Sequence, residues 1–559
     1  MLTKPVLGAK PLRLVLWLGL AAVAASAGCV PDAPPAIRLH PTTVVPEKCA
    51  LVFWVDGMDR EVFERLRRAG KLPNITRYFV RGGVTVRGPV TSIPSITYAC
   101  NVAYHTGLLP GHHGITGDKW FDRYQLIFQD YTFIKTYQQV DGDIRARTIY
   151  ELLADENTAT ILTPVRRGAA RNIDNWASAG VAWFFGFQET VNHLTTLRFE
   201  LIADVANRVG RWPRFILAYF AAPDTIAHAY GRDSSRYADI LIDADRQIGH
   251  ICQALEAAGI LRRTYLTLVT DHGFVNSPKV FDVAEYLRRE LKVPTIDRMF
   301  GHDVPLERRA EHFAKARAVV VAGGNRRCNI HLRTGPHWWR RPTEEEIDQF
   351  ARPAKTDAAQ RPWPGLPALL ARHEAVELVM VNLGRGRIRV QNRRGIGIID
   401  RLVRGGRKLY RYRVVSGADP LGYASVPQAA ALMDGKYHDG DAWLAATLDT
   451  PKPDCVVQLV ELNDSPRNGD IALFAARGWS FVGGDKSSHG GLHRRELLVP
   501  WFWAGPDLPA GGAVTGARTV DLMPTVLHLI GRGDAVPPGL DGRSIAGRLR
   551  AAKAAAAGH

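Results

Sequence analysis

A hydroxyl group stands at an expected helix start within the stretch TSIPSITYACNVAYHTGLLPGHHGITGDKWFDR, which begins at Thr91. Pro94, Ser95 and Thr97 precede an apolar run that is broken at Gly107. Because the first turn of a helix leaves backbone N–H groups unpaired, a hydroxyl there can bind or attack an anion. Serine and threonine also cap ordinary helices, so this stretch alone favours a simple cap.

Three strongly apolar runs each lead to an aspartate. ALVFWV precedes Asp56, FILAYF leads to Asp224 and YLTLVT leads to Asp271, and the last two aspartates have His228 and His272 close by. Such runs are typical of strands buried on both faces of a parallel sheet, whose carboxyl ends border the ligand-binding crevice. Carboxylates and imidazoles are good ligands for a divalent ion. Capping or chance explains any one pair, but three together indicate a site.

A helix is expected between the second and third runs, over ADILIDADRQIGHICQALEAAGI, and this order favours a right-handed βαβ crossover. Residues 324–450 lack the βαβ pattern and instead suggest helices and hairpins with many basic residues. We interpret this segment as an insertion beside the sheet. The α/β pattern returns at DIALFAARGWSF, followed by a loop with His489, the strand LLVPWFWAGP and the helix VDLMPTVLHLIG.

The N-terminus has the pattern of an export signal. Basic residues precede an apolar run from Leu14 to Ala27, and small residues then lead to Cys29, as in the lipobox of bacterial lipoproteins. The run is short for a membrane span. We therefore expect an exported protein, periplasmic or anchored to the outer membrane of a bacterium, with a lipid as its only membrane attachment.

The expected organisation has a signal peptide, a Pro-rich tether, a catalytic α/β core in two parts around an inserted cap, and a tail. These cover residues 1–28, 29–48, 49–323 with 451–550, 324–450 and 551–559, respectively.

Composition supports a globular protein with an anionic partner. The 559 residues are 46% hydrophobic and 23% charged, with a formal net charge of +17. The arginines are densest between Arg385 and Arg413, where they form either a solvated face or the rim of an anionic substrate site. Six scattered cysteines without a CxxC pair argue against a zinc finger, and no nucleic-acid-binding motif is present.

Six ordered signatures add up to a family resemblance. VDGMD, PSITYACNVAYHTGLLPGHHGITGDKWFD, PDTIAH, VTDHG, SHGGLH and VDLMPTVLHLIG occur along the chain. With these, the sequence resembles the alkaline phosphatase superfamily, most closely its nucleotide pyrophosphatase/phosphodiesterase-like branch. The resemblance implies an α/β sandwich with a central, mostly parallel sheet flanked by helices, plus an inserted cap.

The resemblance also implies two divalent metal ions, expected to be zinc, and a threonine nucleophile that forms a phosphothreonine. Thr97 would be the nucleophile, activated by metal coordination. The ligands of one ion would be Asp56, Thr97, Asp271 and His272, and those of the other Asp224, His228 and His489.

Two positions depart from the family pattern. Asp118 stands where related enzymes use an asparagine to contact a phosphate oxygen, and a carboxylate there repels phosphate unless it is protonated or turned away. Some monoesterases of the superfamily carry a Lys-x-Arg pair, of which only Arg167 is present, since Val165 replaces the lysine. Asp118 and Arg167 are therefore candidate substrate-binding residues.

We therefore expect a phosphodiesterase or nucleotide pyrophosphatase that acts on a small phosphodiester or nucleotide-like substrate. A phosphomonoesterase of the same superfamily is the nearest alternative within the enzymes. Sulfatases carry a C/S-x-P-x-R motif, which Thr97 does not match. From another class, a surface lipoprotein that kept the fold without turnover remains an alternative, as does a membrane-modifying transferase.

Overall fold

The computed structural model describes residue 39 and residues 41–133, 136–173, 182, 186–301, 303–353 and 363–554. The predicted signal peptide, Cys29 and the first part of the tether lie outside the described residues, as does the tail from residue 555. Residues Leu39–His559 form one compact unit. Within the described ranges, no helix is both long enough and apolar enough to cross a membrane.

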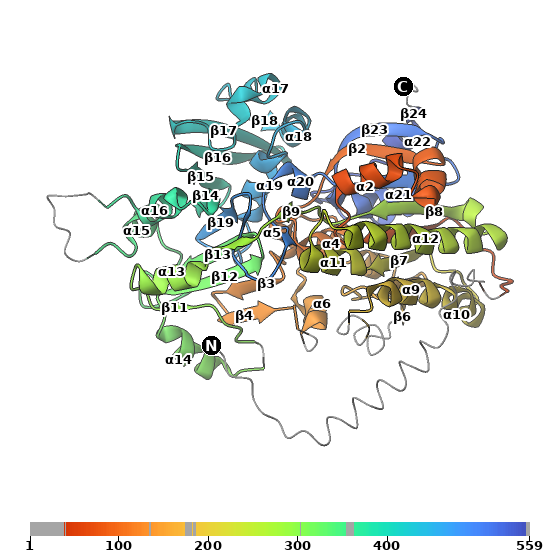
Figure 1. The fold of residues 1–559 in the computed structure, drawn as a ribbon, viewed down its shortest axis with the longest axis horizontal. Helices are drawn as coiled ribbons and strands as arrows, with labels where there is room; N and C mark the ends of the chain where they lie inside the picture. The colour runs from red at the N-terminus through yellow and green to blue at the C-terminus, as the bar shows by residue number, and fades with distance from the viewer. Residues whose placement is uncertain are drawn as a thin grey trace, which may run out of the picture. The chain divides into compact units, whose positions relative to one another are not determined.

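A central, mostly parallel sheet of nine strands is the scaffold of the described core (Figure 1). Five of its neighbouring pairs are parallel, and the pairs that involve β22 or β24 are antiparallel. The strands in spatial order are β24 (Lys553–Ala554), β23 (Gly512–Arg518), β2 (Val84–Val90), β22 (Trp501–Ala504), β8 (Thr264–Val269), β1 (Cys49–Val55), β7 (Phe215–Phe220), β5 (Thr158–Ile161) and β6 (Arg171–Ile173).

The three apolar runs of the sequence are the neighbouring strands β8, β1 and β7. Trp54 of β1 pairs in parallel with Tyr219 of β7 and with Val269 of β8. Parallel strands in this register end at the same edge of the sheet, so the aspartates that follow them are brought together. The expectation of parallel buried strands is therefore confirmed.

Helices cover both faces of this sheet (Figure 1). Trp54 faces one layer, where its ring meets Tyr104 edge-on, while Phe53 faces the other and meets Phe79. The first layer contains α4 (Thr97–Thr106), α5 (Pro110–His113), α7 (Ile149–Leu152), α21 (Leu522–Leu529) and α22 (Ala546–Arg550). The second contains α2 (Arg60–Arg68), α3 (Pro73–Ile75), η1 (Thr76–Arg81), α9 (Gln188–Phe199), α10 (Leu201–Val209), α11 (Ala222–Tyr230) and α12 (Ser235–Ala257).

A second nine-stranded sheet, almost entirely antiparallel, is built within the described residues from the later part of the chain. Its strands in spatial order are β11 (Thr295–Ile296), β12 (Ala318–Gly324), β13 (Arg327–Leu332), β19 (Ile471–Ala475), β14 (Val376–Asn382), β15 (Arg387–Asn392), β16 (Gly395–Arg404), β17 (Arg407–Gly417) and β18 (His438–Asp439).

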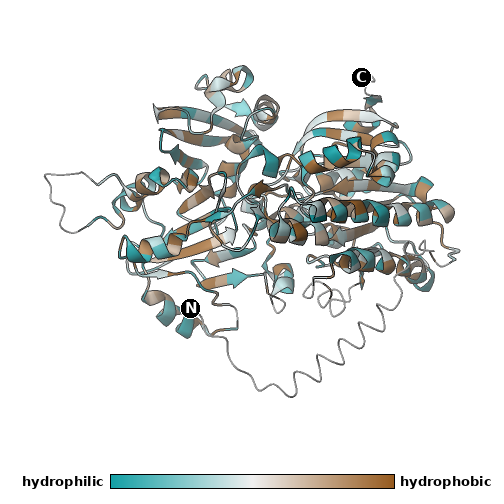
Figure 2. Ribbon diagram, viewed as in Figure 1, coloured by the Kyte–Doolittle hydropathy of each residue, from teal (hydrophilic) through white to brown (hydrophobic). Residues whose placement is uncertain are grey.

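Helices also cover both faces of the second sheet. One face packs against α18 (Gly440–Thr447) and α19 (Cys455–Leu462), and the other against α13 (Val283–Arg289), α15 (Glu344–Gln349) and α16 (Leu366–Arg372). Hydrophobic residues line the strands of both sheets, whereas hydrophilic residues are frequent on the surrounding helices (Figure 2).

One strand lies in a different sheet from the one we expected. DIALFAARGWSF suggested a return to the central sheet, but its strand β19 pairs with β13 and β14 in the middle of the second sheet. Leu473 packs on one face and Phe474 on the other. A strand buried on both faces has the same continuous apolar pattern in either sheet, so pattern alone cannot assign it.

Shorter elements complete the described chain: besides the 3₁₀ helices η2 (Tyr137–Gln139), η3 (Leu261–Arg263), η4 (Tyr423–Ser425), η5 (Thr519–Asp521) and η6 (Gly533–Ala535), they are short α-helices and two-stranded pairs. The helices are α6 (Val140–Asp143), α14 (Leu306–Ala314), α17 (Pro427–Ala430) and α20 (Arg494–Leu497), and the two-stranded pairs are β3 (Lys119–Asp122) with β4 (Ile127–Asp130), β9 (Val275–Asn276) with β21 (Ser487–Ser488), and β10 (Lys279–Val280) with β20 (Trp479–Ser480). The five described cysteines are buried free thiols.

Candidate active site

Asp56 and Asp271 meet at the carboxyl end of the central sheet. Asp56 follows β1 directly, and Asp271 lies two residues after β8. The backbone N–H of Gly57 donates to Asp271 Oδ1 over 3.0 Å, and the hydroxyl of Tyr219 donates to Asp56 Oδ2. Each carboxylate is thus oriented through one oxygen, while its other oxygen stays available to the site.

Helix α11 supplies two further groups. Asp224 and His228 are four residues apart, so they lie on the same face of the helix. His228 Nε2 is 3.2 Å from Asp224 Oδ1. The expected i, i+4 pair is therefore present in the structure.

His272 lies between the pair Asp56 and Asp271 and the carboxylate of Asp224. Its Nε2 atom is 3.5 Å from Asp56 Oδ1, 3.3 Å from Asp271 Oδ2 and 3.8 Å from Asp224 Oδ1. The Thr97 hydroxyl is 3.4 Å from the same nitrogen. His272 Nε2 thus touches both halves of the cluster.

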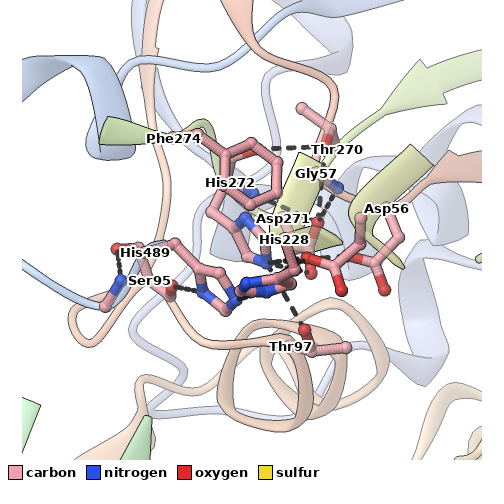
Figure 3. A network of polar contacts seen from close by, with 12 residues as sticks. Asp56, Gly57, Ser95, Thr97, His228, Thr270, Asp271, His272, Phe274 and His489 are labelled. Carbon is pink, nitrogen blue, oxygen red and sulfur yellow. Dashed lines mark hydrogen bonds and ion pairs between the residues drawn. The ribbon is translucent and has the colours of Figure 1, made fainter. Parts of the chain in front are cut away.

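Thr97 is the first residue of α4, which follows a polar turn (Figure 3). The N-cap residue, Ile96, provides no side-chain cap at this helix start, although Asp118 accepts a hydrogen bond from the backbone N–H of Tyr98. The other backbone N–H groups of the first turn and the Thr97 hydroxyl therefore lie together beside the cluster, the arrangement that binds anions at helix N-termini.

His489 reaches the cluster from a loop distant in sequence (Figure 3). Its Nδ1 atom lies 2.9 Å from the carbonyl oxygen of Ser95, and its Nε2 atom lies 3.1 Å from His228 Nε2. The ring stacks on His272 with centroids 3.5 Å apart. A second histidine of the same loop, His493, is an N-cap that accepts a hydrogen bond from the backbone N–H of Arg495.

The structure brings all seven expected metal-site residues into one cluster. Potential ligand atoms of Asp56, Asp271 and His272 lie within 4.8 Å of one another, as do those of the second set, Asp224, His228 and His489. Three carboxylate oxygens in the cluster are buried and accept no hydrogen bond: Asp56 Oδ1, Asp224 Oδ1 and Asp271 Oδ2.

Buried carboxylate oxygens without a partner are costly, and a cation would satisfy them. Oxygen and imidazole nitrogen donors suit a divalent ion of hard or borderline character. The residues present therefore fit two divalent metal ions.

Burial opposes charge throughout the cluster. It raises the pKa of Asp56 well above its usual value, with help from the charges of Asp271 and Asp224, and it lowers the pKa of His272 to about 4. Burial also disfavours a charged His228, but Asp224 outweighs it and raises the pKa of that imidazole. Carboxylates crowded so closely stay ionised only beside positive charge.

Sequence reasoning missed several side chains that hold the cluster in place. Asp485 Oδ2 lies 3.1 Å from His228 Nδ1, the nitrogen that faces away from the cluster. Phe274 packs edge-on against the rings of His228, His272 and His489. Asp485 lies only four residues before His489, a proximity in sequence that could have suggested its role.

Asp118 lies beside the start of α4. Its Oδ1 atom accepts a hydrogen bond of 3.3 Å from the backbone N–H of Tyr98, the residue after Thr97. Burial raises the pKa of Asp118 to about 7, and Asp130 and Asp224 add to the shift while Lys119 opposes it. The carboxyl group is therefore close to half-protonated at neutral pH.

The structure does not bring Arg167 into contact with the cluster. Its guanidinium donates to the carboxylate of Glu151 and to the carbonyl oxygens of Asp141, Ile144 and Ala146. Since each guanidinium nitrogen already has an acceptor, Arg167 supports the local fold and leaves no donor for a phosphate.

Comparisons with known proteins agree with this site. Residues 50–338 match the family described as type I phosphodiesterase / nucleotide pyrophosphatase. Among curated proteins, an uncharacterised pyrophosphatase/phosphodiesterase of Schizosaccharomyces pombe is 26% identical over 249 residues, covering 41% of this chain and 46% of the relative. Human ectonucleotide pyrophosphatase/phosphodiesterase family member 5 is 22% identical over 222 residues, covering 38% and 43%. The match thus spans less than half the length of each relative.

Two solved structures of murine ectonucleotide pyrophosphatase / phosphodiesterase 5 share the fold at 14% identity. An inactive variant in complex with AMP aligns with a TM-score of 0.53 over 88% of this chain and 96% of that protein. A second structure aligns with a TM-score of 0.54 over 90% and 99%. The family match covers more than half of the 559 residues, and the fold agrees with it. The chain therefore belongs to the type I phosphodiesterase / nucleotide pyrophosphatase family of the alkaline phosphatase superfamily.

Proposed function

We propose that this chain hydrolyses phosphodiesters with Thr97 as nucleophile and two divalent metal ions, zinc in the first instance, as cofactors. The observation that carries the proposal is the position of the Thr97 hydroxyl, 3.4 Å from His272 Nε2 at the first residue of α4. Family membership supports the reaction class, and the seven clustered side chains support the cofactor.

The chain's own residues define the two chemical steps. Thr97 Oγ1 attacks phosphorus, the bond to the leaving alcohol breaks, and a phosphothreonine forms. Water then attacks that phosphorus, which releases a phosphomonoester and restores the hydroxyl. Backbone N–H groups at the start of α4, other than that of Tyr98, which donates to Asp118, stabilise the phosphoryl oxygens through both steps. One ion would be held by Asp56, Thr97, Asp271 and His272. The other would be held by Asp224, His228 and His489.

The bound ions would supply positive charge that activates the hydroxyl and neutralises the leaving oxygen. Every other contribution comes from how the protein holds its ligands. Tyr219 and Gly57 orient Asp56 and Asp271, Asp485 orients His228, and Phe274 fixes the three imidazole rings.

A diester fits the site better than a monoester. A monoester dianion needs more positive charge around its phosphoryl oxygens, yet Val165 replaces the lysine of the Lys-x-Arg pair and Arg167 is engaged elsewhere. Asp118, when ionised, would repel a dianion more strongly than a monoanion. The AMP complex of the murine relative supports a nucleotide-like substrate.

The N-terminal signal pattern supports export as a lipoprotein, so we propose that the reaction takes place outside the cytoplasm. A bacterial periplasm or outer-membrane surface is the compartment that fits Cys29 as a lipid acceptor.

Metal content and turnover of the mature protein test this proposal. Aryl phosphate monoesters and diesters are assayed with wild type, Thr97→Ala and Thr97→Ser. We expect about two zinc ions per chain in wild type and faster turnover of the diester. Removal of the nucleophile in Thr97→Ala should lower diester turnover by at least about a thousandfold, whereas Thr97→Ser keeps a hydroxyl and part of the activity.

Three results would contradict the proposal in different ways. Preferential turnover of the monoester would indicate a phosphatase. Equal turnover of wild type and Thr97→Ala would exclude Thr97 as nucleophile. Bound metal without turnover on either ester would identify a non-catalytic protein with this fold.

A further inference from the structure

A cavity of about 730 Å³ with several charged side chains in its wall lies apart from the proposed active site. None of the seven clustered side chains lines it. Its wall includes Arg145, Arg341, Arg385 and Arg401 together with His112 and Asp464. The volume falls in the range of small-molecule sites, and most of the charged side chains in the wall are cationic.

One side of the cavity is a closed network of ion pairs. His112 contacts Asp541 at 2.5 Å, Asp464 at 3.0 Å and Glu461 at 3.1 Å. Arg401 lies 2.9 Å from Glu461 and 2.6 Å from Asp464. Lys408 completes the set, 2.9 Å from Glu461 and 2.8 Å from Asp541. Three cations therefore neutralise three carboxylates, so this side does not need a metal ion.

The other three arginines of the wall are less well compensated. Arg385 is exposed and forms no hydrogen bond or ion pair with the described residues. Arg145 has one carboxylate partner, Asp122, at 3.0 Å and keeps 41% of its side chain exposed. Of the described residues that line the cavity, only Asp464 carries a carboxylate, and it belongs to the closed network.

Arg341 is the most buried of these three arginines, and its Nη2 atom donates to the carbonyl oxygens of Ser465 at 3.3 Å and Asn468 at 3.5 Å. Its Nη1 atom is buried without a hydrogen-bond partner, and the nearest carboxylate oxygen, on Asp470, is 3.9 Å away. Asp470 already accepts a 2.5 Å hydrogen bond from Arg123. Burial lowers the pKa of Arg341, which Asp470 offsets only in part. An anion in the cavity would compensate this charge.

We propose that this cavity binds a phosphate group, either free or on a small ester. The guanidinium groups come from three separate segments: after α6, before α15 and in the turn between β14 and β15. A tetrahedral phosphate presents oxygens in several directions and can meet donors from all three, whereas a planar carboxylate presents only two oxygens in one plane. This proposal does not depend on the proposed catalytic function.

A bound phosphate would also join two parts of the molecule. Arg145 lies in the segment that carries the family match, and Arg385 lies in a turn that joins two strands of the second sheet. Since the ligand contacts both, binding should stabilise the folded chain against heat.

Titration calorimetry of the full-length, metal-loaded protein with inorganic phosphate tests the proposal at constant ionic strength. We expect two classes of site in wild type. The first class is the active site. Its dissociation constant for phosphate should equal the inhibition constant that phosphate shows as a competitive inhibitor of diester hydrolysis. The other should weaken about tenfold in Arg385→Gln, as expected for the loss of one charge-assisted contact, and further in Arg341→Gln/Arg385→Gln.

Arg394→Gln is the matched control, because Arg394 is also exposed and lies near Arg385 in sequence but does not line the cavity. The single Arg385 variant keeps the test valid if loss of the half-buried Arg341 impairs folding. The proposal would be overturned if Arg385→Gln left every class of phosphate site unchanged, or if Arg394→Gln weakened binding equally. Tighter binding of citrate than of phosphate at the second class would overturn the assignment to phosphate.

Discussion

At the scale of single residues, the candidate site is a set of side chains whose charges conflict unless a cation is present. Asp56, Asp224 and Asp271 each direct a buried, unpaired oxygen into one small volume. Burial raises the pKa of Asp118, which lies beside the start of α4, to about 7. In the proposed reaction, protonation at Asp118 would decide whether a phosphate oxygen meets a donor or a repelling charge.

Asp118→Asn should remove a pH dependence from diester turnover. In wild type the carboxyl is protonated below its pKa of about 7 and ionised above it. The value of kcat/KM should therefore fall as pH rises through about 7, or through a lower pH when nearby metal ions favour the carboxylate. The Asn variant, which stays neutral, should lack this fall.

A pH series of kcat/KM for both proteins checks the prediction. Lys119→Gln is a useful control, because Lys119 is the nearby cation that opposes the shift, and its loss should move the fall to higher pH. An Asn variant with the same pH profile as wild type would show that Asp118 does not face the substrate.

At the scale of elements, the strand ends place the ligands and a few tight turns complete the geometry. Gly57, directly after Asp56, has a φ of +62°, and its N–H holds Asp271. A Cβ atom on Gly57 would lie 2.6 Å from the ring of Phe274 and 3.2 Å from the Cα of Asp224. The turn after β1 therefore requires glycine for both its conformation and its close packing.

Gly57→Ala should damage the site, whereas Gly70→Ala should affect stability alone. Gly70 has a similar φ of +70° but no atom near its would-be Cβ. Both changes should cost about 1–2 kcal/mol for the left-handed backbone. Only Gly57→Ala should also displace Phe274 and lower metal affinity and diester turnover.

Denaturant unfolding, zinc titration and turnover of the two variants separate these effects. Turnover reduced equally in Gly57→Ala and Gly70→Ala would mean that backbone strain, and not the contact with Phe274, controls the site.

At the scale of the whole molecule, the network around His112 connects the segment after α4 to distant parts of the chain. Burial opposes the imidazolium, but hydrogen bonds with Asp464, Asp541 and Glu461 outweigh it and raise the pKa of His112 to about 11. The pKa values of the three carboxyl groups are lowered in return, although burial alone would raise them. The network is thus most favourable when the histidine and the carboxylates are charged.

His112→Gln should destabilise the protein in a pH-dependent way. The folded pKa of His112 lies above its unfolded value near 6.5, so its contribution is fully present below about pH 6.5 and fades as pH rises toward about 11. The carboxylates act in the opposite sense, and their contribution fades below about pH 4. Loss of one buried partner should cost about 3 kcal/mol near pH 6.

Urea unfolding from pH 5 to pH 10 checks this expectation, with the exposed His337→Gln as control. The difference between wild type and His112→Gln should narrow toward the alkaline end. A difference that stays constant with pH would mean that His112 contributes by packing and not by charge.

The sequence by itself determined the parts of the site that depend on local pattern. Apolar runs predict buried parallel strands, and Asp56, Asp224 and Asp271 come after those strands in the sequence. Since the carboxyl ends of parallel strands border the binding crevice, the three aspartates are expected there. The family resemblance then singled out His489 and Thr97. These residues are recognisable because strand burial and helix starts depend on nearby sequence.

Tertiary structure alone decided which chain-distant groups meet. It stacked His489 on His272, set Asp485 against His228, bound every guanidinium nitrogen of Arg167 to local acceptors, and placed β19 in the second sheet. It also gathered Arg145, Arg341 and Arg385 around one cavity. Contacts between segments hundreds of residues apart depend on how the sheets and helices pack, and no local period in the sequence records that packing.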